Sequence, residues 1–182
     1  LGDDTAEREG RMTLNPLVHI DPIGTFLLPL MGIPFGWAKP VPINPLRFDR
    51  KYSMRTGMMV SAAAGPVSNI LMAVAATVVY GVLFRFAPET VARGSSMAHL
   101  LVILIEINVV LALFNMLPVF PLDGSRVADG LMPERFRPLW DSLNRFAPFL
   151  LIAVFFYGGS LISGPRNFLI GLLSRLLVAI TS

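Results

Sequence analysis

Long apolar stretches separated by short charged segments dominate the pattern of the chain. Thr56–Phe84 contains no charged residue and exceeds the roughly 20 apolar residues that a bilayer-spanning helix needs. Ala98–Leu117 predicts a second span, and Phe146–Pro165 predicts a third. Asn167–Ser182 is shorter and is interrupted by Arg175, so it fits a fourth span or an interfacial helix equally well. The pattern predicts an all-α membrane protein, a polytopic bundle of three to four helices.

A proline-rich region precedes these spans. Ile23–Ala38 is uncharged but contains several prolines and glycines, which break a helical hydrogen-bond ladder at that density. Because irregular backbone is not tolerated against lipid at membrane depth, we expect a re-entrant or interfacial hairpin that leans on other helices. Lys39–Pro45 is expected to be extended, since residues before prolines avoid the α region. Residues 1–55 then form a polar connector and hairpin, residues 56–182 form the transmembrane helices, and 1–182 is a single membrane-embedded core.

Composition supports a membrane protein. Only 15% of the 182 residues are charged and 54% are hydrophobic, whereas a soluble domain carries about 25% charged residues. The mean hydropathy is +0.65, which also excludes intrinsic disorder. The chain has no cysteine, so disulfides, thiolate metal sites and cysteine nucleophiles are excluded.

The basic residues indicate topology rather than nucleic-acid binding. The net charge is +3, and the Lys and Arg residues lie in short loops, a distribution that fits anionic lipid headgroups. Lys39–Arg55 carries five of them and Pro118–Arg145 carries four, nine in all, against three on the opposite side at Arg85, Arg93 and Arg166. The positive-inside rule therefore places both loops in the cytoplasm. We expect an integral protein of the cell inner or plasma membrane that contacts the lipid bilayer and no nucleic acid.

The segment Asn115-Met-Leu-Pro-Val-Phe-Pro-Leu-Asp-Gly124 holds the main candidate chemistry. Its two prolines end the preceding helix, and Gly124 can adopt a positive-φ turn that aims the Asp123 carboxylate back toward the bundle. A carboxylate at the mouth of a membrane bundle is costly unless it is paired or bound to metal. Local physics alone also fits an N-cap role for Asp123 in a helix that begins near Ser125.

The same string resembles the second signature of the site-2 protease family, the intramembrane zinc metalloproteases. Gly65-Pro-Val-Ser-Asn69, Asn15–Gly24 and Gly36–Pro42 are similar to further elements of that family, in the same order. The resemblance implies that Asp123 is a zinc ligand and that Asn115 faces the substrate near the metal.

One family element is missing from the sequence. The first signature, His-Glu-x-x-His, places two zinc-binding histidines and a water-activating glutamate on one helix. The chain has only His19 and His99, and neither is followed by Glu. We expect the sequence to begin just downstream of that helix, with Leu1–Arg11 as the connector. It then holds one of three expected zinc ligands and no general base.

The resemblance implies a zinc-dependent endopeptidase that cuts a transmembrane helix of a protein substrate near the cytoplasmic face. Zinc would lower the pKa of its bound water and polarise the scissile carbonyl, and Asn115 would hydrogen-bond the substrate backbone or the developing oxyanion. Gly36–Pro45 could pair with the unwound substrate as an added strand. Two alternatives stay open, a non-catalytic membrane scaffold and a small transporter or channel subunit with Glu106 lining a path.

Other polar residues are given structural roles. Asn108 is expected to form hydrogen bonds between helices, Ser68 and Asn69 to mark tight helix packing, and His19 to be a satisfied structural histidine. Glu106 lies about 200° around its helix from Asn108 and points away from the asparagine face. It is protonated, paired with a neighbouring helix or functional, and the sequence does not decide between these roles.

Overall fold

A computed structural model describes residues 1–13, 15–27, 30–32 and 38–182. The chain divides into two compact units, Leu1–Gly57 and Met58–Ser182, which are described separately. Within the described residues the regular structure is helical throughout.

Three helices are long and apolar enough to cross a membrane: α3 (Met54–Phe86), α4 (Ser96–Asn115) and α7 (Ala147–Thr181). Their most apolar windows have mean hydropathies of 2.0, 2.4 and 1.7. The predicted all-α membrane fold is confirmed, with three candidate spans in the described residues.

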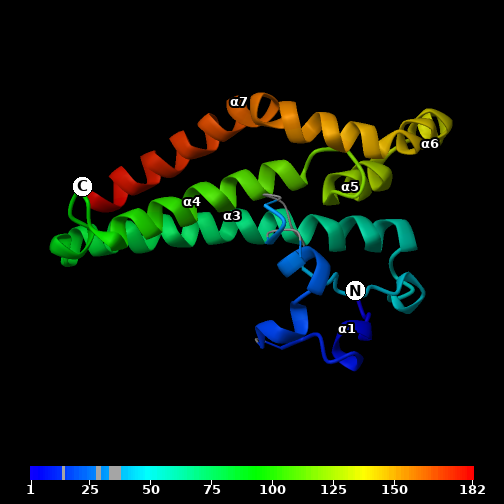
Figure 1. The fold of residues 1–182 in the computed structure, drawn as a ribbon, viewed down its shortest axis with the longest axis horizontal. Helices are drawn as coiled ribbons and strands as arrows, with labels where there is room; N and C mark the ends of the chain where they lie inside the picture. The colour runs from blue at the N-terminus through cyan, green and yellow to red at the C-terminus, as the bar shows by residue number, and fades with distance from the viewer. Residues whose placement is uncertain (14, 28–29, 33–37) are drawn as a thin grey trace. The chain divides into compact units, whose positions relative to one another are not determined.

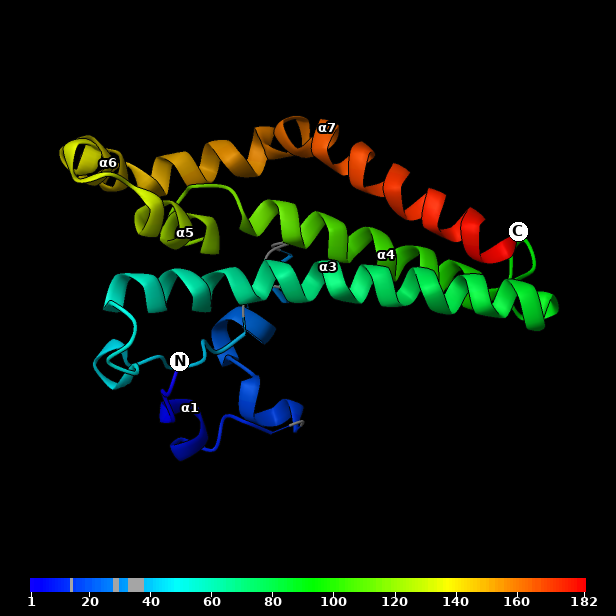
Figure 2. The ribbon, with the colours of Figure 1, turned by 180° about the vertical axis from the view of Figure 1, so that it is seen from behind.

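The three long helices lie side by side (Figures 1 and 2). α3 and α4 run antiparallel and are joined through a short 3-10 turn, η4 (Pro88–Val91). α7 runs along α4, and the short helices α5 (Asp123–Leu131) and α6 (Arg137–Arg145) lie near the first half of α7. This arrangement puts the α4–α5 connection at the end of the bundle where α3 begins.

Small residues let α3 and α4 pack closely. Ala76 of α3, Val91 of η4, and Ala98 and Leu101 of α4 form one buried cluster. In lipid there is no hydrophobic drive between helices, so association depends on close van der Waals contact, which small side chains permit. The end of the α3–α4 hairpin next to η4 is therefore held by apolar packing.

The third span differs from the sequence-based expectation. Instead of a helix that ends at Pro165 and a separate segment 167–182, α7 continues through Pro165 to Thr181. A proline is tolerated inside a membrane helix when neighbouring groups and local adjustment satisfy the freed backbone, and α7 is bent near its middle (Figure 2). Arg166, which we counted in an extracytoplasmic loop, lies within this helix, where it is paired with Glu106 of α4.

The N-terminal unit is more ordered than a simple polar connector. It contains α1 (Thr5–Arg8) and three short turns: η1 (Pro16–His19), η2 (Pro22–Leu27) and η3 (Pro45–Arg47). Residues 28–29 and 33–37 of the expected proline-rich hairpin lie outside the described residues. Residues 38–44 carry no helix, but Pro45, expected to be extended, begins η3 because the Asn44 side chain accepts a hydrogen bond from the Leu46 N–H and caps the turn.

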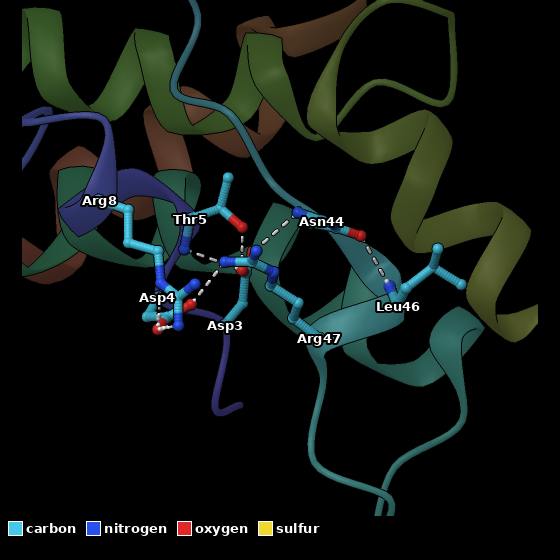
Figure 3. Close-up of polar contacts among 7 residues, drawn as sticks. All are labelled: Asp3, Asp4, Thr5, Arg8, Asn44, Leu46 and Arg47. Carbon is cyan, nitrogen blue, oxygen red and sulfur yellow. Dashed lines mark hydrogen bonds and ion pairs between the residues drawn. The ribbon is translucent and has the colours of Figure 1, made fainter.

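Two aspartates tie the start of the chain to the segment around Asn44 (Figure 3). Asp3 accepts hydrogen bonds from the Thr5 N–H at 3.0 Å and from the Asn44 N–H at 2.8 Å. Asp4 forms ion pairs at 2.7 Å with Arg8 and 2.9 Å with Arg47. The contacts with Asn44 and Arg47 join residues 41 and 43 positions apart in the chain, so the acidic start of the sequence is a structural element of its unit.

The side chain of Arg11 also holds segments of the N-terminal unit together. Its side chain is 94% buried, with 6% exposed. The guanidinium donates to the carbonyl of Val18, to that of Lys39 at 2.7 Å and to that of Pro40 at 3.2 Å. The planar fork of an arginine suits several acceptors at once, and Arg11 uses it to hold two chain segments together.

Candidate functional site

The candidate site lies where α4 gives way to α5. α4 ends at Asn115, residues 116–122 form a turn with two prolines, and α5 begins at Asp123 itself. The N-cap position belongs to Leu122, and no side chain makes a capping hydrogen bond there. The alternative in which Asp123 caps a helix starting near Ser125 is therefore wrong, because the helix begins two residues earlier.

Gly124 has a different role from the expected positive-φ turn. Positive φ occurs at four other described glycines, and Gly124 is helical. A Cβ at Gly124 would lie 2.3 Å from the carbonyl carbon and oxygen of Met116, closer than real Cβ contacts allow. The missing side chain thus lets the first turn of α5 pack directly on the backbone that leaves α4.

α5 rests against α3 near both of its ends. A Cβ at Gly130 would lie 2.5 Å from Cβ of Met59 on α3. At the other end, a Cβ at Gly65 of α3 would lie 3.0 Å from Oδ2 of Asp123. Gly65 thus leaves the space that the Asp123 carboxylate occupies against α3.

Asp123 is half-buried in the protein without a compensating partner. Burial raises the pKa of its carboxyl above the ordinary value of 3.8, and the positive charge of Arg126 opposes that effect. Within the described parts of the chain no hydrogen bond or ion pair reaches the Asp123 carboxylate. A partly desolvated carboxylate without such a partner is costly and is available to a cation.

Asn115 and Asn108 make the same kind of contact. The Asn115 amide donates to the Leu111 carbonyl at 3.0 Å, and the Asn108 amide donates to the Leu104 carbonyl at 2.7 Å. The hydrogen bond expected between helices at Asn108 is thus made within α4 instead. Because an amide nitrogen carries two N–H groups, Asn115 keeps a second donor at the end of α4.

The remaining polar candidates have local partners. The His19 ring lies 2.9 Å from the Thr13 carbonyl oxygen, in line with a satisfied structural histidine. The His99 ring lies 3.2 Å from the Ser95 carbonyl oxygen at the start of α4. Ser68 donates to the carbonyl four residues earlier on α3 at 2.8 Å. These groups stabilise their own segments.

The described residues do not by themselves make a zinc site. Among them, no three His, Cys, Asp or Glu side chains lie close enough together to hold a metal ion. Catalytic zinc is normally held by three protein ligands with a fourth position open. Asp123 offers one oxygen ligand of the required chemistry.

A cavity with mixed polar and apolar walls was not found from the sequence. It has a volume of about 250 Å³ and lies beside α5, with walls from α3, the α4–α5 turn, α5 and α6. Its lining includes Met58, Phe120, Ser125, Arg126, Trp140 and Asn144. Because these residues come from four elements, no local sequence pattern could have identified it.

Glu106 is separate from this site. Its carboxylate forms an ion pair with Arg166 of α7, which decides between the roles that the sequence left open in favour of pairing with a neighbouring helix. The sequence contains an indication of this pairing, since Arg166 is a second charged residue in an otherwise apolar stretch. The pairing was missed because Arg166 was assigned to a loop.

Comparison with known proteins agrees with the resemblance. Residues 82–157 match the profile of Peptidase family M50. The chain is 40% identical over 155 residues to the Bacillus subtilis (strain 168) protein named "Putative zinc metalloprotease YwhC", an alignment that covers 85% of this chain and 68% of that protein. No solved structure matches. On this evidence, with its helical membrane fold, the chain belongs to peptidase family M50, the site-2 protease family.

Proposed function

We propose that the protein acts as an intramembrane zinc endopeptidase that cleaves transmembrane segments of protein substrates near the cytoplasmic face. Family membership and the membrane-spanning helices support a membrane metalloprotease. The proposal adds the class of substrate and the side of the membrane.

The Asp123 carboxylate carries this proposal. It lies at the end of the bundle, against Gly65 of α3, and has no polar partner in the described residues. A cation would supply the missing compensation, so we assign Asp123 as one oxygen ligand of the zinc. The sequence contains no His-Glu-x-x-His motif, so Asp123 is the one zinc ligand that we assign.

Two further segments are assigned to substrate binding. The free N–H of the Asn115 amide can donate to a substrate carbonyl or to the oxyanion that forms from it. The described backbone of residues 38–44 is free of helix, which suits pairing with an extended peptide. A substrate helix must unwind before its peptide bond is accessible, and pairing with an extended segment favours that state.

The orientation follows from the loop charges. With Arg166 inside α7, loops 39–55 and 118–145 hold nine basic residues, against two, Arg85 and Arg93, on the opposite side. The positive-inside rule then places the N-terminal end of α3, and the Asp123 site near it, on the cytoplasmic side.

A non-catalytic scaffold is the second candidate, because Asp123 is a lone ligand in the described residues. A transporter is disfavoured, since Glu106 is neutralised by Arg166 rather than open to a path.

The test uses the full-length protein as produced in cells. We expect Asp123→Ala to lose bound zinc and cleavage of a model transmembrane substrate while it inserts normally. Asp141→Ala, which removes an exposed carboxylate from α6, is the matched control and should keep both. A wild-type protein that binds the substrate helix but holds no stoichiometric zinc would establish the scaffold instead.

A further inference from the structure

The Glu106–Arg166 ion pair lies deep within two membrane helices. Glu106 is the eleventh of the 20 residues of α4, and Arg166 is the twentieth of the 35 residues of α7. At about 1.5 Å per residue, Glu106 is about 15 Å from either end of α4. A charge at such a depth is expensive unless it is paired.

Nothing else in the described residues neutralises these charges. The Glu106 and Arg166 side chains are 41% and 34% exposed, so the protein does not enclose them. Glu106 also borders a cavity of about 160 Å³ that includes the hydroxyls of Thr77 and Ser174. Both hydroxyls donate to carbonyls of their own helices at 2.8 Å, so neither proton is directed to the carboxylate. Glu106 therefore relies on Arg166.

The apolar surface of α7 does little to fix the rotation of this helix about its own axis. Large hydrophobic side chains are exposed along the helix, among them Phe149, Phe156, Leu161, Phe168 and Val178. Because lipid chains are as apolar as these side chains, burying one face against α4 is no more favourable than burying another. A polar contact distinguishes the faces, since only one rotation of α7 brings Arg166 to Glu106.

We propose that the Glu106–Arg166 pair is a lock that sets the rotation of the second half of α7 on the α3–α4 hairpin. Arg166 directly follows Pro165, so the lock lies where the ladder of α7 is interrupted. The C-terminal end of this half of α7 packs against α3. There, Gly81 faces Ile180 and the Arg85 guanidinium donates to the Ile180 carbonyl at 3.3 Å.

A double-mutant cycle tests the pairing. We expect Glu106→Leu and Arg166→Leu each to lower the thermal unfolding midpoint of the full-length protein in bilayer nanodiscs by about 5 °C or more. The double Leu variant should recover most of that loss, because replacing both members of an ion pair by apolar groups is often neutral. Arg175→Leu, on the same helix, is the matched control and should change the midpoint little. A double variant that loses the sum of the single effects would overturn the pairing.

A disulfide tests the rotation separately from stability. The chain has no cysteine, and a Cβ at Gly81 would lie 3.0 Å from Cβ of Ile180. The two Cβ atoms of a disulfide lie roughly 3.8 Å apart. The two helices therefore need to move apart only slightly at this point to accommodate one. Gly81→Cys with Ile180→Cys should therefore cross-link readily in the parent protein and in the Arg175→Leu control.

Cross-linking should fall several-fold in the double Leu variant even where its stability recovers, because the Glu106–Arg166 contact no longer selects the rotation and only the hydrogen bond from Arg85 to the Ile180 carbonyl remains. The charge-swapped variant, Glu106→Arg with Arg166→Glu, should restore it. Undiminished cross-linking in the Leu variant, or no restoration by the swapped pair, would show that apolar packing sets the rotation and would overturn the lock.

Discussion

Glu106 and Asp123 are two carboxylates of one helix bundle in opposite situations. Glu106 lies midway along α4 and is paired with an arginine of the neighbouring helix. Asp123 lies beyond the end of α4, against the backbone of α3, and has a raised pKa and no polar partner in the described residues. Glu106 is deeper in its helix, and it is the one whose charge is already satisfied.

The contrast distinguishes a charge that holds helices together from a charge that is available to a ligand. A carboxylate that is neutralised by a fixed side chain holds helices together and has little capacity left for a ligand. A carboxylate that is partly desolvated and unpaired costs stability in the free protein, and binding a cation recovers that cost. Depth in the membrane alone would have selected Glu106, whose charge is already paired.

The largest expected effect comes from neutralising Asp123. Asp123→Asn should lower the rate of substrate cleavage by about 100-fold or more, the scale of removing a directly acting group. In the metal-free protein its unfolding midpoint at neutral pH should not fall, because the change removes a carboxylate whose ionised form is disfavoured in the fold. Cleavage assays and thermal unfolding of the same preparations provide the check, and a variant that is active but unstable would reverse the two assignments.

Neutralising Glu106 should give the converse result. Glu106→Gln leaves Arg166 unpaired inside the bilayer, so the free energy of unfolding should fall by about 2.5–3.5 kcal/mol, the cost of an isolated charge at the centre of a helix. Zinc content per folded molecule should stay at the wild-type level. Unfolding titrations and metal analysis measure the two quantities. Loss of zinc from folded Glu106→Gln protein would place Glu106 at the functional site.

Gly65→Ala probes the Asp123 side of the comparison without removing a charge. The added methyl group would lie 3.0 Å from Oδ2 of Asp123, so the carboxylate must shift by a few tenths of an ångström. We expect about a tenfold loss of cleavage, with stability retained because alanine favours helix by up to about 1 kcal/mol over glycine. Gly171→Ala on α7, where no atom lies within 4 Å of the new methyl, is the control and should keep full activity.

Asp3 is a third carboxylate, and its pKa shift predicts a dependence of stability on pH that is opposite to that of Asp123. Hydrogen bonds from the Thr5 hydroxyl and the Asn44 N–H lower the pKa of Asp3 below 3.8, the opposite direction to Asp123. The stabilisation from ionised Asp3 is therefore complete above pH 3.8 and is lost as the pH falls through the lower folded pKa. For Asp123 the sign reverses, and its protonated form is favoured in the fold as the pH falls.

The effect expected for Asp3 is the smallest of the four predicted effects. Hydrogen exchange at the Asn44 amide should accelerate, relative to its intrinsic rate, as the pH is lowered through the folded pKa of Asp3. Asp3→Asn should remove this pH dependence. An Asn44 amide that exchanges with the same pH profile in both proteins would show that the contact in Figure 3 does not stabilise the N-terminal unit.

Hydropathy was sufficient to predict the helical membrane fold and the approximate spans, because each apolar run exceeds the thickness of the bilayer core. It failed at α7, where Pro165 and Arg166 together suggested a break. The charge of Arg166 is compensated by a residue 60 positions earlier, and a pattern along one segment cannot contain that information.

The candidate site was predicted in part. The string around Asp123 made this residue a candidate, but its surroundings depend on contacts between elements. Gly124 is needed for its close approach to Met116 rather than for a positive φ, and the Asp123 carboxylate lies against Gly65 of another helix. The buried guanidinium of Arg11 was overlooked for the same reason, since its acceptors are carbonyls that only the folded unit brings together.

The unequal lengths of α3 and α4 have a consequence for the membrane around the protein. Gly65 is 11 residues from the start of α3, so the Asp123 carboxylate lies about 16 Å along that helix from its first residue. Helices of 33 and 35 residues beside one of 20 create a hydrophobic mismatch that the bilayer must absorb by thinning or by tilt of the longer helices. The acyl-chain length of the lipid thereby changes how far water must travel to reach Asp123, and under the proposed function bilayer thickness would be a physical control on hydrolysis there.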